Sequence, residues 1–140
     1  MIQSLDRMEL AQEIDRHAQK RGIVMPVLVQ VNIGQESQKG GVAPEEAISF
    51  IRSVHALPGL AVQGLMCIMP HVSDEQTLRP LFRSMRTLFE RTRGEAVAGT
   101  DIRHLSMGMS ADYELAAQEG ATMVRVGSAI FGRRSGVQAI

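Results

Sequence analysis

The chain has 140 residues, and its 15 lysines and arginines balance 15 aspartates and glutamates, so its formal net charge is zero. This balance argues against a dedicated nucleic-acid or membrane surface, and no apolar run approaches the roughly 20 residues that cross a bilayer. The single cysteine, Cys67, excludes an internal disulfide framework or a metal cluster and indicates a reducing, cytoplasmic setting. The length favours one domain, although an α/β barrel typically needs about 250 residues.

Strand and helix patterns alternate along the first half of the chain. Residues 1–5 have the composition of the end of a strand, and Asp6 with Glu9 has the spacing of a helix capping box. Apolar residues then recur at helical spacing until Gly22, which predicts a stop. Residues 26–33 are mostly apolar at odd and even positions alike, which predicts a strand buried on both faces. A polar loop follows, and Pro44 stands at a plausible first position of the next helix.

The same alternation continues in the second half. Residues 60–70 read as a strand, Asp74 can cap a long helix, and residues 103–110 read as a strand and turn. A short helix at 111–120 and a strand at 121–127 follow. This order predicts an α/β fold with parallel strands, either half of an (α/β)8 barrel or a small open sheet. The chain contains no metal-binding or Ser/His/Asp catalytic motif, so we expect no metal site.

Two turns rich in small residues follow the last two predicted strands. In parallel α/β folds ligands bind at the carboxyl ends of strands, where turn N–H groups and serine hydroxyls suit a phosphate. The alternative is that these are ordinary tight turns, with Ser110 capping the helix that begins at residue 111. The first turn contains Ser106, Met107, Gly108 and Ser110, and the second contains Gly127 and Ser128.

Two polar residues stand at or within predicted strands. Arg125 lies in an otherwise apolar strand, where a buried guanidinium needs a partner. That partner is either a carboxylate, such as Asp112 or Glu114, or an acceptor on a ligand. Asn32 lies at a strand end, where it either contacts a ligand or bonds its own backbone in a turn.

Several longer segments resemble the pyridoxal phosphate homeostasis protein family over residues 2–133. The resemblance is carried by LSMGMSADYELA and GATMVRVGSAIFG, supported by SLDR, VLVQVNIGQESQKGG and GLMCIMP. It implies a (β/α)8 barrel similar to that of alanine racemase, and a protein that binds pyridoxal 5′-phosphate (PLP). Members of this family have no firmly assigned reaction and are credited with buffering or delivering PLP.

The resemblance also assigns roles to residues. It implies that Ser106, Met107, Gly108, Ser110, Gly127 and Ser128 form a phosphate cradle, with Asn32 also at the cofactor site. Arg125 would face the pyridine nitrogen and leave it unprotonated, which suits a carrier better than an enzyme. No catalytic residue is expected. Two alternatives are a racemase-like PLP enzyme and a non-catalytic half-barrel that interacts with a partner.

This chain departs from the family in length. It resembles about the second half, or strands 4–8 of the barrel, so residues 1–140 would form one N-terminally truncated PLP-binding domain. The lysine that bonds to PLP in the family belongs to the first strand, and neither Lys20 nor Lys39 matches it. We therefore expect a fragment or a start codon assigned too late. Open sheet edges would favour self-association or poor solubility.

Overall fold

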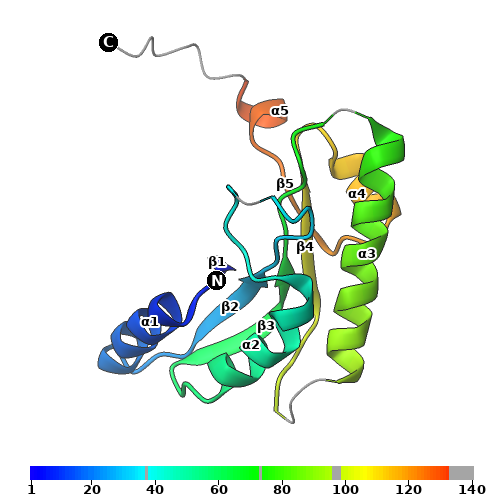
Figure 1. The fold of residues 1–140 in the computed structure, drawn as a ribbon. Coiled ribbons are helices and arrows are strands. Elements are labelled where there is room, and N and C mark those ends of the chain that lie inside the picture. The colour runs from blue at the N-terminus through cyan, green and yellow to red at the C-terminus, as the bar shows by residue number, and fades with distance from the viewer. Residues whose placement is uncertain (37, 73, 96–98, 133–140) are drawn as a thin grey trace.

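The computed structural model alternates strands and helices along the chain (Figure 1). It describes residues 1–36, 38–72, 74–95 and 99–132. The strands are β1 (Ile2–Leu5), β2 (Met25–Gln30), β3 (Leu60–Met66), β4 (His104–Met109) and β5 (Met123–Arg125). The helices are α1 (Met8–Lys20), α2 (Ala47–His55), α3 (Glu75–Gly94), α4 (Tyr113–Gln118) and α5 (Ser128–Phe131), with a 3-10 turn at Pro44–Glu46 before α2.

The five strands form one parallel sheet with the order β1-β2-β3-β4-β5. Figure 1 shows that this sheet is curled, with α1, α2 and α3 following one another around one side of it. The prediction of a parallel α/β fold is therefore confirmed. Of the two architectures that the sequence allows, the curled sheet matches part of a barrel rather than a flat open sheet.

A hydrophobic core lies between the sheet and the helices. Val27 and Val29 of β2 point into it and are fully buried, and Leu28, of the opposite parity, is fully buried as well. The strand is therefore buried on both faces, as its composition predicts. Each fully buried side chain of this size contributes about 1.5–3 kcal/mol. The largest buried side chains of the core include Leu5, Ile51, Leu65, Phe82, Met85, Leu105 and Met107.

The predicted helix starts have different outcomes. Asp74 caps α3 as predicted, since its carboxylate accepts from the backbone N–H groups of Gln76 (3.2 Å) and Thr77 (3.0 Å). The capping box of Asp6 and Glu9 is wrong. The chain stays extended through Arg7, which becomes the N-cap of α1 without a side-chain cap, and Asp6 pairs with the Arg7 guanidinium instead.

A buried carboxylate joins α1 to the turn before β3. Asp15 is 7% exposed, and its Oδ1 accepts from the backbone N–H of Gly59 at 2.7 Å. Its Oδ2 accepts from Gln19 Nε2 at 2.6 Å. Both carboxylate oxygens are thus satisfied, which a buried carboxylate requires.

Candidate functional site

The two small-residue turns lie beside each other at the carboxyl edge of the sheet. Parallel pairing places Met109 of β4 opposite Arg125 of β5. Ser110 Oγ accepts from the backbone N–H of Gly127 at 3.0 Å and of Ala129 at 3.2 Å. The hydroxyl oxygen of one turn therefore occupies a point at which two N–H donors of the other turn converge.

Ser110 does not cap the helix that follows it. That alternative is wrong, because α4 begins at Tyr113 and its N-cap residue is Asp112. The carboxylate of Asp112 instead accepts from the backbone N–H of Met109 at 2.6 Å, which closes the turn between β4 and α4. The hydroxyl of Ser110 is thereby available to the neighbouring turn.

Arg125 is partly buried, and its guanidinium bonds to neutral oxygens. Nη1 donates to Ser106 Oγ at 2.7 Å, and Nη2 donates to the carbonyl oxygen of Cys67 at 2.7 Å. Neither Asp112 nor Glu114 forms an ion pair with it: Asp112 accepts from Met109 N, Glu114 contacts the Tyr113 hydroxyl, and the carboxylate alternative is wrong. Burial lowers the pKa of Arg125 from its usual value, and an arginine remains charged despite such a shift. Among the residues that the structure describes, no carboxylate forms a salt bridge with Arg125, although the Asp112 carboxylate partly opposes the effect of burial on its pKa.

A cavity of about 800 Å³ connects these groups. This volume lies within the range of roughly 300–1,000 Å³ that small-molecule sites occupy. Its wall combines the two turns and Arg125 with apolar side chains of the loop after β3, among them Ile68 and Val72, which are 42% and 44% exposed. The polar groups that line it include Lys39, Ser110, Arg125 and Ser128.

The remaining residues of the first predicted turn lie inside the sheet rather than at its rim. Ser106 is fully buried, and its hydroxyl lies 2.7 Å from Gln3 Oε1 as well as 2.7 Å from Arg125 Nη1. Met107 is fully buried in the hydrophobic core. Gly108 has a φ of +94°, and a Cβ there would lie 2.5 Å from the Cβ of Ala116. No sequence pattern predicts that Gln3 lies at this site, because its contact with Ser106 joins residues 103 positions apart.

Asn32 organises the loop that follows β2. Its Nδ2 donates to the carbonyl oxygens of Glu36 (2.9 Å) and Lys39 (3.3 Å), and its Oδ1 accepts from Glu36 N at 3.2 Å. This is the turn-forming alternative, and it is confirmed. Asn32 does not line the cavity, but its loop brings Lys39 to the wall, where Nζ donates to the Met69 carbonyl oxygen at 3.1 Å.

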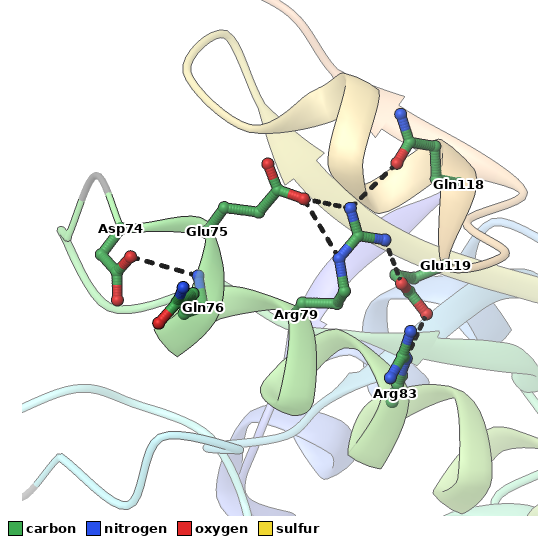
Figure 2. A network of polar contacts seen from close by, with 7 residues as sticks. All are labelled: Asp74, Glu75, Gln76, Arg79, Arg83, Gln118 and Glu119. Carbon is green, nitrogen blue, oxygen red and sulfur yellow. Dashed lines mark hydrogen bonds and ion pairs between the residues drawn. The ribbon is translucent and has the colours of Figure 1, made fainter.

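An ionic network holds α4 against α3 (Figure 2). The carboxylate of Glu119, just after α4, accepts from Arg79 Nη1 at 2.5 Å and from Arg83 Nε at 3.0 Å. Arg79 also donates to Glu75 and to Gln118. The hydrogen bonds from Arg83 and Arg79 lower the pKa of Glu119. This network fixes the far end of the helix whose near end carries the Ser110 turn.

Two kinds of feature are not found in the part of the chain that the structure describes. No group of three or more His, Cys, Asp or Glu side chains is arranged to hold a metal ion. No described helix has both the length and the apolar character needed to cross a membrane.

Comparison with known proteins identifies relatives that share this architecture. Residues 1–135 match the family described as "Alanine racemase, N-terminal domain". The chain is 45% identical over 134 residues to the pyridoxal phosphate homeostasis protein of Aquifex aeolicus, covering 96% of this chain and 58% of that protein. It is 32% identical to PipY of Synechococcus elongatus, solved with PLP bound, with a TM-score of 0.82 over 94% of this chain and 60% of that one.

A more distant likeness concerns the fold alone. Alanine racemase of Clostridium difficile superimposes with a TM-score of 0.71 at 18% identity, covering 99% of this chain and 37% of that one.

The chain spans less than two thirds of the length of the curated relatives that it matches. Since the family match covers nearly every residue, the chain belongs to the alanine racemase N-terminal domain family.

Proposed function

We propose that this chain binds PLP in the cavity between the two turns and that it acts in intracellular PLP homeostasis, as a carrier or buffer. The observation that carries the proposal is the hydroxyl of Ser110, on which two backbone N–H groups of the neighbouring turn converge. It stands in the same cavity as Arg125, an arginine that forms no salt bridge with any carboxylate in the described part of the chain. The names of the relatives in Aquifex aeolicus and Synechococcus elongatus support the same ligand.

The phosphate end of PLP fits the two turns. A phosphate oxygen is an acceptor, as Ser110 Oγ is, so it can share or take over the N–H groups of Gly127 and Ala129. The serine hydroxyl can then donate its own proton to the phosphate. A Cβ on Gly127 would meet no atom within 4 Å, so the space in front of this turn is open to a ligand. Ser128 lines the same space.

The ring end of PLP fits Arg125. When bound, PLP supplies an aldehyde and an electron-accepting ring. A guanidinium can donate a hydrogen bond but does not readily give up its proton, so Arg125 would donate to the pyridine nitrogen and leave it unprotonated. This weakens the ring as an electron sink, which supports a role in holding and releasing the cofactor. Asn32 would contribute at one remove, by holding the loop of Lys39.

We further propose that the five strands correspond to about strands 4–8 of an eight-stranded barrel, in one domain. In support, the described sheet is curled and ends in two edge strands, β1 and β5. Unpaired strand edges associate with other chains. The isolated chain should therefore self-associate, and a stable monomer on gel filtration would contradict this.

A PLP titration of the purified chain tests the proposal. Replacing Arg125 by Ala removes the ring contact, and replacing Gly127 by Asp places a negative charge where the phosphate would lie. Each change should weaken binding at least about tenfold, or about 1.4 kcal/mol. Gly94→Asp is the matched control, since Gly94 also has open space around its Cα but lies at the end of α3, away from the cavity. Unchanged affinity in both site variants would exclude this site.

A further inference from the structure

We infer that Gln3 is a positioning residue for this site, because its side-chain oxygen directs the hydroxyl of Ser106 and thereby holds Arg125 in the cavity. Ser106 Oγ lies 2.7 Å from Gln3 Oε1 and 2.7 Å from Arg125 Nη1. The three side chains form a chain of hydrogen bonds that ends at the guanidinium facing the ligand. The inference deepens the proposed function and depends on it for the identity of the ligand.

The direction of each hydrogen bond follows from the chemistry of the groups. A guanidinium only donates, so the oxygen of Ser106 must accept from Arg125. The single hydroxyl proton of Ser106 is then donated to Gln3 Oε1, the acceptor that the described part of the chain places next to it. An amide nitrogen of Gln3 at this point would face the serine with a second donor and leave the hydroxyl proton without a partner. Gln3 must therefore present its oxygen.

Burial makes the contact necessary. Ser106 is fully buried, so water cannot replace a missing acceptor at its hydroxyl. If the side chain of residue 3 offers no acceptor, the hydroxyl loses its fixed orientation, and Arg125 loses a well-directed partner. The remaining bond, from Nη2 to the Cys67 carbonyl oxygen, allows the guanidinium to pivot away from the ligand.

The contact also spans the concave side of the sheet. Gln3 belongs to β1 and Ser106 to β4, and two further strands separate β1 from β4 in the sheet order. In a flat sheet, strands three places apart lie about 14 Å from each other, too far for two side chains of this size to bond. The curl brings them together. A residue of the first edge strand thus reaches the site formed by the last two strands.

Two substitutions of Gln3 distinguish the effect of its hydrogen-bond acceptor from the effect of its side-chain volume. Gln3→Met keeps the length of the side chain and removes the acceptor, whereas Gln3→Glu keeps an acceptor and removes the amide donor. Gln63→Met is the matched control, because it makes the same change on a neighbouring strand. Gln63 lies on β3, three residues before Met66, the strand partner of Ser106. We expect Gln3→Met to weaken PLP binding about three- to tenfold, while Gln3→Glu and the control stay within about twofold of wild type.

Titration with inorganic phosphate and a second substitution identify the route of the effect. Under the proposed function, inorganic phosphate would bind at the turns of Ser110 and Gly127 and not at Arg125, so Gln3→Met should leave its dissociation constant unchanged. In a Ser106→Ala background, Gln3→Met should cause no further loss of PLP affinity, because the chain of hydrogen bonds from Gln3 to Arg125 is already broken. Equal weakening of PLP and inorganic phosphate, or full additivity with Ser106→Ala, would overturn the inference.

A measurement on the free protein separates this inference from the proposed function. In ¹⁵N NMR spectra, the guanidinium N–H signals of Arg125 should be protected from solvent exchange in wild type and in Gln3→Glu, and exchange faster in Gln3→Met. Absence of PLP binding by wild type would refute the proposed function, and the NMR comparison would still decide the role of Gln3. Equal protection in all three proteins would refute that role.

Discussion

Replacing Gly108 by Ala should destabilise the protein and disturb the site together. Gly108 has a φ of +94°, which an alanine adopts at a cost of about 1–2 kcal/mol. The added Cβ would lie 2.5 Å from the Cβ of Ala116 and 3.0 Å from the Cα of Tyr113, both in α4. Overpacking of this kind costs about 1–3 kcal/mol. The two effects together predict a loss of about 2–5 kcal/mol.

Urea unfolding followed by circular dichroism measures this loss, and Gly127→Ala is the matched control. Gly127 has a negative φ of −116°, and a Cβ there would meet nothing within 4 Å, so alanine should change stability by less than about 0.5 kcal/mol. Because relief of the clash requires α4 to move away from β4, Gly108→Ala should also weaken PLP binding through the turn of Ser110. A loss below about 1 kcal/mol would refute the packing that the structure shows around Gly108.

Three further predictions concern groups outside the cavity. Glu119→Gln should lower the thermal midpoint at pH 7. The difference from wild type should be full above 4.5, the usual pKa of this carboxyl group, and should close as pH falls from there through the lowered pKa of the folded state. A difference that does not change with pH would contradict the ionic role of Glu119. Burial raises the pKa of Cys67 to about 12, so a thiol reagent at pH 8 should label this single cysteine only as urea unfolds the chain, and rapid labelling of the native protein would argue against its burial. Asp15→Ala should cost about 1–3 kcal/mol in urea unfolding, since it leaves the buried N–H of Gly59 unpaired, and an unchanged midpoint would show that another group replaces the carboxylate.

The sequence predicts the element order well because that order is recorded locally. Runs that are apolar at both parities, such as the one around Leu28, occur where a strand is covered on both sides. Asp74 can cap α3 because β3 ends well before it, at Met66. Asp6 fails as a cap because β1 keeps the backbone extended as far as Arg7, and pairing within a sheet is invisible in a local pattern.

The candidate site divides in the same way. The meeting of Ser110 with Gly127 and Ser128 is readable from sequence, since residues after neighbouring parallel strands lie at one edge of the sheet, whereas the predicted turn begins too early because β4 extends to Met109. The partners of Ser110 and Arg125 are not readable, because several acceptors and donors are available at each position. The structure selects Gly127 N and Ala129 N for Ser110, and two neutral oxygens rather than a carboxylate for Arg125.

The choice of neutral partners for Arg125 has a functional consequence. A carboxylate bonded directly to the guanidinium would occupy the N–H groups that a ligand acceptor needs and would pair with the positive charge before a ligand arrived. Ser106 Oγ and the Cys67 carbonyl oxygen fix the orientation of the side chain, and the Asp112 carboxylate acts on its charge only from a distance, without a salt bridge. The cost of partly burying that charge is visible in the lowered pKa of Arg125, and an acceptor on a bound ligand would offset it. If the cavity binds PLP as proposed, the arrangement would favour its liganded state, and it depends on curvature of the sheet, which brings Gln3 to Ser106.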